Sequence, residues 1–239
     1  MITKSQMLNS IRKTQEHLGE INLLKSFIKP VFLEPNKDFN EVCLNKESTY
    51  EEIYLSGLQK QYYNIILEDY SYFQFNFNEI ENREERIFTP YARYAFYPNP
   101  FKNYYDDLSE YYNLFNIGEI NFEEYSQVYS EAKPFLKKVF VRYDFSCKQY
   151  KKIYHPTAHF HFGIEENTRI ASDKFFSPLA FCMFIINMYY VEYMERKSDE
   201  FFNLENLYKK EFQELLKVDN FNSEIEYYCD LQKGLISIK

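Results

Sequence analysis

The stretch that decides the fold is SYFQFNFN, residues 71–78, in which Phe73, Phe75 and Phe77 alternate with polar side chains. Successive side chains of a β-strand point to opposite faces, so this pattern predicts a strand with one buried face. Residues 86–97 form a second aromatic stretch of the same kind. The proline at position 90 places that strand at a sheet edge, at a bulge or with a late start.

The order of predicted strands and helices along the whole chain indicates the fold class. Strands that follow each other closely imply antiparallel hairpins, against which helices pack. The sequence therefore predicts an α+β fold, with an antiparallel sheet of about four strands and with helices on one face and at both ends. The predicted strands cover residues 71–78, 86–97, 138–146 and 157–164, with a further short strand at 235–238. The predicted helices cover residues 3–28, 48–68, 103–115, 121–133, 177–196 and 204–217.

Length and composition bound the organisation of the chain. It has 239 residues, of which 45% are hydrophobic and 27% charged, values that suit one globular domain with its own core. No repeat or low-complexity linker divides it. We expect a single domain with a helical part over residues 1–69, the sheet and a histidine motif over 70–170, and a helical part over 175–239.

The cysteine spacing and the N-terminal residues indicate the cellular compartment of the protein. The four cysteines form no CxxC pair, and the first 15 residues are polar, without the apolar core of a signal peptide. We therefore expect four reduced thiols, mostly buried, and a cytoplasmic protein. The apolar run FFSPLAFCMFIINMYYV, residues 175–191, is short and polar for a membrane span, which favours a buried core helix and no membrane partner.

Charge is unevenly distributed. The net charge is −8, yet residues 133–174 hold nine Lys or Arg against four acids, together with three of the four histidines. A local positive field of this kind favours an anionic ligand, although a lysine-rich hairpin tip kept in water gives the same pattern. The candidate anion-binding side chains are Arg142, Arg169, Lys151 and Lys152.

The sharpest chemical feature is HPTAHFHFG, residues 155–163. His159 and His161 are two apart on a predicted strand and so share one face, and His155 shares it if the strand starts at the proline. These three histidines are the primary catalytic candidates.

The preceding strand adds Arg142 and Asp144, which are also two apart. If the two strands pair, both side chains lie across from the histidines, because opposed residues are about 5 Å apart at Cβ. Asp144 would then fix a histidine tautomer, and Arg142 would bind carboxylate or phosphate oxygens. Arg93 joins the cluster only if the sheet order allows; otherwise it is a surface residue of an edge strand.

A resemblance to a known family rests on these residues. The chain contains Arg142-Tyr143-Asp144-Phe145, then HPxxHxHxG at 155–163, then Arg169-Ile170 and a helix that begins at Ser177-Pro178. This combination resembles the uncharacterised bacterial domain-of-unknown-function family 2290, over most of the chain and most sharply between residues 139 and 190. The chain has Ala171 where family members usually have proline. The resemblance implies a site at these residues rather than a particular activity.

Three interpretations of the cluster are open. The first is metal-independent phosphodiester cleavage, with one histidine as base, another as acid and Arg142 on the phosphate. The second is a divalent metal site, in which His159, His161 and Asp144 are the ligands and the metal activates water. The third is a polar layer of the sheet in a non-catalytic binding or adaptor subunit of a multiprotein bacterial complex.

We expect the first, a His-dependent nuclease or phosphodiesterase that acts as an effector, a toxin in a bacterial conflict or antiphage system. RNA is the favoured nucleic acid, and a partner or antitoxin from the same operon is expected. The conflict setting is an analogy with small bacterial His-rich toxins. The sequence contains no P-loop, GxGxxG or GxSxG motif, which argues against NTP hydrolysis and dinucleotide cofactors.

Overall fold

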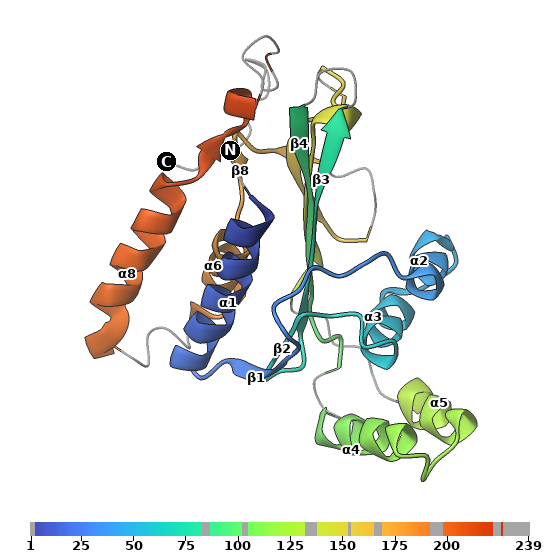
Figure 1. Cartoon of the computed structure of the whole chain (residues 1–239). Helices are drawn as coiled ribbons and strands as arrows, with labels where there is room; N and C mark the ends of the chain where they lie inside the picture. The colour runs from blue at the N-terminus through green and yellow to red at the C-terminus, as the bar shows by residue number, and fades with distance from the viewer. Residues whose placement is uncertain are drawn as a thin grey trace.

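A seven-stranded antiparallel sheet, seen edge-on in Figure 1, runs through the molecule. Its strand order, β1-β2-β3-β4-β5-β6-β7, is the order of the chain. The computed structural model describes residues 3–82, 87–101, 105–131, 138–152, 154–164, 169–191, 198–221 and 226. The strands are β1 (Leu24–Phe27), β2 (Ile65–Leu67), β3 (Tyr72–Asn82), β4 (Ile87–Tyr97), β5 (Val141–Ser146), β6 (Ala158–Phe162) and β7 (Ile170–Ala171), with β8 (Lys174–Phe175) and β9 (Leu216–Lys217) paired separately. The helices are α1 (Lys4–Glu20), α2 (Lys37–Leu44), α3 (Tyr50–Gln59), α4 (Tyr105–Asn116), α5 (Phe122–Glu131), α6 (Pro178–Tyr189) and α8 (Ser198–Gln213), with short 3-10 turns at Cys147–Gln149 and Val218–Phe221.

The four predicted strands are the central strands β3 to β6, so the α+β class is confirmed while the expected strand number is too small. The strands that the sequence did not reveal in this sheet are β1, β2 and β7, of four, three and two residues. Segments this short cannot display a period of two. Their strand conformation depends on pairing with a neighbour that is already in place.

One face of the sheet packs against α1, α6 and α8 (Figure 1). The phenylalanines of β3 point to this face, with Phe73 and Phe75 fully buried. Helix α6 is apolar on nearly all sides, because it lies between the sheet and the outer helices. The main hydrophobic core therefore lies on this side.

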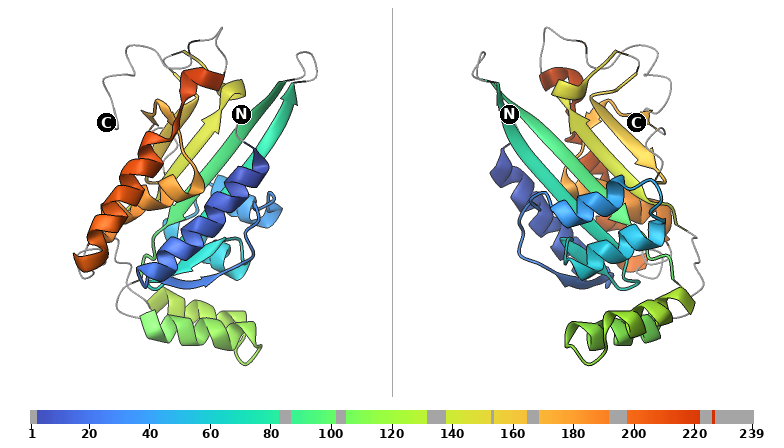
Figure 2. Two further views of the ribbon diagram at one scale, coloured as in Figure 1. Left: turned by 60° about the vertical axis from the view of Figure 1, so that its left-hand side comes forward. Right: turned by 90° about the vertical axis from the view of Figure 1, so that its right-hand side faces the viewer.

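Helices also cover the opposite face, which corrects the expectation of helices on one face only. There α2 and α3 build a second core in which Phe39 and Tyr54 pack with Tyr72 and Tyr97, near the end of the β3–β4 hairpin (Figure 2). The sequence did not predict α2. Its start carries a capping signal, since the side chain of Asn36 accepts a hydrogen bond from the backbone of Phe39.

Two predicted helices end earlier than expected. Helix α1 ends at Glu20, and Asn22, with φ of 54°, turns the chain into β1 instead of continuing to residue 28. Helix α3 begins with the predicted capping box of Thr49 and Glu52, but it ends at Gln59 rather than residue 68. The N-terminal part that we expected to be helical therefore also contributes two strands.

Helices α4 and α5 form a hairpin that lies beyond one end of the sheet in both views of Figure 2. The turn between them contains Gly118 at φ of 76°, a conformation that glycine adopts without strain. Residues 105–131 contain seven Asp or Glu and no Lys, Arg or His. The hairpin is thus strongly acidic.

Helix α6 starts as predicted, with the Ser177 hydroxyl accepting a hydrogen bond from the backbone of Ala180 and with Pro178 in the first turn. It ends at Tyr189, short of the predicted residue 196. Within the described residues, no helix combines the length and the apolar character that a membrane crossing requires. The strand predicted at 235–238 lies outside the described residues.

Candidate metal centre

Strand register brings the polar residues of the sequence motifs together on one face of the sheet. Arg93 of β4 pairs with Asp144 of β5, and Asp144 pairs with His159 of β6. In the next row, Arg142 pairs with His161. Directly opposed residues of an antiparallel pair point to the same side, so the five side chains share the face that α2 and α3 partly cover.

Asp144 is the centre of this group. Its Oδ1 accepts a hydrogen bond from Arg93 Nε at 3.0 Å, and its Oδ2 accepts one from Arg142 Nε at 2.9 Å. Burial alone would raise the pKa of Asp144, but His161 and the two guanidinium groups outweigh burial and hold the pKa well below its ordinary value. The carboxylate is therefore ionised at neutral pH.

His159 has one fixed tautomer. Its Nδ1 lies 2.8 Å from the carbonyl oxygen of Pro156, which can only accept, so Nδ1 carries the proton and Nε2 carries a lone pair. Nε2 lies 3.9 Å from Asp144 Oδ2. Burial lowers the pKa of His159 to about 3 even though the Asp144 carboxylate opposes the shift, so the ring is neutral. Two acceptor atoms thus face each other inside the protein.

His161 completes the group. Its Nε2 lies 3.4 Å from Asp144 Oδ2, close enough to interact electrostatically but without the geometry of a full hydrogen bond. Its ring centroid is 4.8 Å from that of His159. The exposed fractions of His159 and His161 are 1% and 2%, so neither ring can satisfy its nitrogens with bulk water.

Buried polar atoms without a partner concentrate here. Among the described residues, nine buried side-chain nitrogen or oxygen atoms have no hydrogen-bond partner, and six of them belong to His155, Thr157, His159, His161 and Arg169. Each such atom costs about 1–3 kcal/mol when left unpaired. Buried polar atoms in native proteins are mostly paired with protein, ligand or ordered water, so this group of atoms is where the described residues best accommodate a bound ligand.

His155 and Arg169 lie at the rim of the cluster. The ring of His155 packs edge-on against that of His159, with centroids 4.9 Å apart, and its side chain is only partly buried. The pKa of His155 is lowered, first by burial and then by the charge of Arg169, which places these two residues near each other. Arg169 therefore adds positive charge on the His155 side.

The two lysines proposed from the sequence as anion ligands do not join this cluster. Lys151 bonds through its backbone to His155, and its side chain is exposed, as is that of Lys152. They belong to the turn before β6, so the alternative of a lysine-rich hairpin tip in water describes them better.

Arg93 was predicted to join the cluster only if the sheet order allowed, and in the structure it is a member of the cluster. β4 lies beside β5, which puts Arg93 directly opposite Asp144. Burial lowers the pKa of Arg93, but the Asp144 carboxylate more than offsets this and raises the pKa above its ordinary value. The exposed fraction of the Arg93 side chain is 45%, so part of its guanidinium group faces solvent.

The cysteines differ from the expectation of mostly buried thiols. Cys182 is buried in α6, Cys147 is partly buried and Cys43 is exposed, while residue 229 lies outside the described residues. The charges of Arg142 and Arg93 act on Cys43, so the end of α2 lies beside the two arginines. An exposed thiol therefore marks the border of the cluster.

The donor atoms fit a metal ion. One ligand atom from each of Asp144, His159 and His161 lies within 4.8 Å of the others. A tetrahedral ion with bonds of about 2.0–2.2 Å separates its ligands by roughly 3.4 Å, so the atoms that lie furthest apart would have to approach by up to about 1.4 Å. The backbone carbonyl that holds His159 Nδ1 also supplies the outer contact that metal-binding histidines usually have.

Fold and site together define a class: an α+β protein with an antiparallel sheet that carries a buried His–His–Asp cluster between two arginines. The chain belongs to the family described as "Uncharacterized conserved protein (DUF2290)", whose match spans residues 22–226. No curated protein and no solved structure matches the chain.

Proposed function

We propose that this chain is a metal-dependent phosphodiesterase, a nuclease with RNA as its favoured substrate, in which Asp144, His159 and His161 hold a divalent ion. The observation that carries the proposal is the lone pair of His159 Nε2, which faces the ionised Oδ2 of Asp144 at 3.9 Å. Two facing acceptors repel each other unless a cation or a hydrogen-bond donor lies between them, and a divalent cation satisfies both at once. Imidazole nitrogen and carboxylate oxygen are ligands that Zn, Fe and Mn accept, and three protein ligands leave positions for water and substrate.

The two arginines support an anionic substrate. Arg93 and Arg142 each bond Asp144 through Nε, and neither guanidinium group makes a further hydrogen bond among the described residues. Their Nη groups therefore keep their donors for a ligand, in the fork geometry that fits phosphate oxygens. The two guanidinium groups and the one carboxylate together leave one net positive charge, which an anionic substrate would compensate.

The chemistry follows from these parts. A divalent ion at this position would lower the pKa of a bound water molecule and so supply a nucleophile at neutral pH. In hydrolysis, the water oxygen bonds to phosphorus, the bond to one ester oxygen breaks, and that oxygen leaves with a proton. Arg93 and Arg142 hold the phosphate, and His155 at the rim is the candidate proton acceptor.

Burial makes His159 and His155 poor proton donors for the metal-free acid–base pair that we expected first. Such a pair needs one imidazolium, and burial lowers the pKa of both His159 and His155. A neutral imidazole that points a lone pair at a carboxylate is better suited to bind a cation than to donate a proton.

The test combines metal content with RNA cleavage. Protein purified without chelators should contain about one equivalent of a divalent metal and should cleave RNA, and EDTA should abolish both. The His159→Ala/His161→Ala double variant should lose both properties. His17→Phe is the matched control, because His17 is equally buried but lies in α1, and it should keep both.

Other outcomes separate the alternatives. Cleavage by metal-free wild type that EDTA leaves unchanged would reject the metal centre and support acid–base chemistry. Folded wild type that binds no metal and cleaves no RNA would support the non-catalytic binding or adaptor subunit. The effector role extends the same comparison to cells: expression of wild type should slow bacterial growth, expression of the double variant should not, and equal growth would argue against toxicity.

A further inference from the structure

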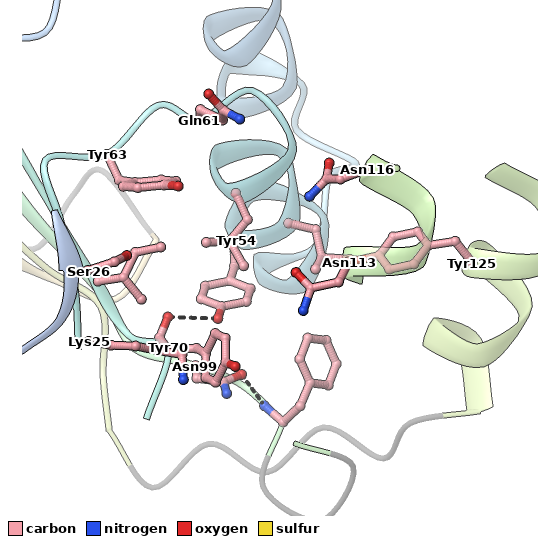
Figure 3. Close-up of a pocket in the computed structure, with 14 residues that line it drawn as sticks. Lys25, Ser26, Tyr54, Gln61, Tyr63, Tyr70, Asn99, Asn113, Asn116 and Tyr125 are labelled. Carbon is pink, nitrogen blue, oxygen red and sulfur yellow. Dashed lines mark hydrogen bonds between the residues drawn. The ribbon is translucent and has the colours of Figure 1, made fainter. Parts of the chain in front are cut away.

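A cavity of about 540 Å³ lies between α3, the β1–β2 edge and the α4–α5 hairpin (Figure 3). Asn99, just beyond the end of β4, contributes to its wall, whereas Arg93, which contacts Asp144 of the candidate metal centre, lies further back along that strand. The volume is within the range of about 300–1,000 Å³ that small-molecule sites occupy. The cavity is therefore a separate candidate site.

Aromatic rings and carboxamides dominate the wall of the cavity. Figure 3 shows Tyr63 and Tyr125 on opposite sides of it, with Asn113 and Asn116 of α4 on the same side as Tyr125. The aromatic lining residues are Tyr54, Tyr63, Tyr70, Phe101 and Tyr125, and the carboxamides are Gln61, Asn99, Asn113 and Asn116. None of the described residues that line the cavity carries a carboxylate.

Most of these carboxamides have hydrogen-bonding capacity to spare. Asn99 is committed to the fold, because it donates to Asp69 and accepts from the backbone of Phe101. The side chains of Gln61, Asn113 and Asn116 make no hydrogen bond among the described residues. Each of these three side chains offers a hydrogen-bond donor and an acceptor. They can form hydrogen bonds with the edge of a planar heterocycle while the aromatic rings stack on its face.

Lys25 is the basic side chain of the wall among the residues that the structure describes. Lys25 is exposed, and its Nζ lies over the ring of Tyr70, 4.3 Å from the centroid, which favours a position at the mouth of the cavity. A single lysine suits one phosphate group. The nearby α4–α5 hairpin, with seven acids and no basic residue over 105–131, opposes a ligand with several negative charges.

We propose that this cavity binds a purine nucleoside or its 5′-monophosphate, with the base between the aromatic rings and its edge on Gln61, Asn113 and Asn116. A carboxamide matches the adjacent donor and acceptor of adenine, so adenosine is the favoured base-bearing ligand. Lys25 contacts the phosphate when one is present. The charge of the hairpin makes a triphosphate or a longer nucleic acid the weaker ligand. The inference does not depend on the metal centre.

Isothermal titration calorimetry on the full chain tests this, with adenosine, AMP, ATP, uridine and ribose as probes. Adenosine and AMP should bind, ATP should bind at least tenfold more weakly than AMP, and ribose should not bind. Asn113→Ala/Asn116→Ala should weaken adenosine at least tenfold. Both asparagines are exposed, so the fold should persist, and Asn40→Ala on α2, also exposed and remote from the wall, is the matched control.

A second variant separates base from phosphate recognition. Lys25→Gln should bring the affinity for AMP down to that for adenosine and leave adenosine unchanged. The proposal is overturned if wild type binds neither adenosine nor AMP, if the Asn113→Ala/Asn116→Ala variant binds adenosine as wild type does, or if ribose binds as well as adenosine. Each of these readings is obtained without measuring cleavage, so it is distinguishable from a failure of the proposed hydrolase.

Discussion

At the scale of single residues, burial decides which charge state a side chain can hold. His17 of α1 has an exposed fraction of 2% and contacts Tyr208 of α8, with Nε2 and the phenol oxygen 3.4 Å apart. Burial lowers its pKa from 6.5 to about 4. Between these values the unfolded chain binds more protons than the folded one, so this histidine weakens the fold as pH falls through that window.

We therefore predict a pH-dependent effect of His17→Phe, which keeps a ring against Tyr208 but cannot be protonated. Between pH 7.5 and pH 5 the free energy of unfolding of wild type should fall by about 2 kcal/mol more than that of the variant. Urea denaturation at the two pH values measures this. Other buried histidines act equally in both proteins, so only the difference reports on His17, and identical pH dependence would contradict the prediction.

Gly57 of α3 is a helix position at which there is no room for a side chain larger than a hydrogen atom. A Cβ at this position of α3 would overlap the phenol oxygen of Tyr72 and lie 2.7 Å from its Cζ. Tyr72 is fully buried and donates to the backbone of Tyr54, so it cannot move aside.

Gly57→Ala should therefore destabilise the protein by about 1–3 kcal/mol, although alanine is intrinsically the better helix former. Gly19→Ala is the control, because a Cβ there meets only Leu24 Cδ2 at 3.9 Å. That change should be neutral or stabilise by up to about 1 kcal/mol. Chemical denaturation of both variants decides, and a neutral Gly57→Ala would mean that Tyr72 has room to shift.

At the scale of elements, the long strands are those in which apolar and polar residues alternate in the sequence, and these strands pair over most of their length in the structure. β3 and β4 pair residue by residue from Tyr72 with Tyr97 to Asn82 with Ile87. Pro90 is tolerated because the β4–β5 ladder begins at Tyr91, so at the proline β4 has β3 as its only neighbour in the sheet. The sequence allowed a sheet edge, a bulge or a late strand start at Pro90. In the structure β4 is a central strand, but the part of it that contains Pro90 is paired on one side only.

Some helix boundaries could be predicted from local sequence and others could not. The caps at Thr49 and Ser177 were recognisable because a capping side chain bonds the backbone three residues on, within one helical turn. The early ends of α1 and α3 were not recognisable. Apolar runs such as Ile65-Ile66-Leu67 fit a buried helix and a buried strand equally well, and only a neighbouring strand decides between them.

At the scale of the whole molecule, two hydrophobic cores lie on opposite faces of one sheet. They share strands, since Tyr72 belongs to one core and the next residue, Phe73, to the other. A strand cannot unfold on one face only. The single domain expected from the sequence therefore predicts one cooperative unfolding transition.

Two core variants test this coupling. Ile185→Ala lies in the core of α6 and Leu58→Ala in the core of α3, and each should cost about 2–5 kcal/mol through lost burial and the cavity left behind. Both should shift the same calorimetric transition, whose calorimetric and van't Hoff enthalpies agree. Two transitions, each lowered by only one of the variants, would show that the cores unfold as separate units.

The sequence by itself determined the α+β class, the four long central strands and the face that each of their residues occupies, because these follow from a local period of two. It also placed Arg142 and Asp144 on the same kind of face as His159 and His161. It could not determine strand order, and strand order is what places Arg93 opposite Asp144 and buries the histidines. The pairing of distant segments depends on which arrangement buries both faces of the sheet and pairs every strand, and that balance exists only in the folded chain.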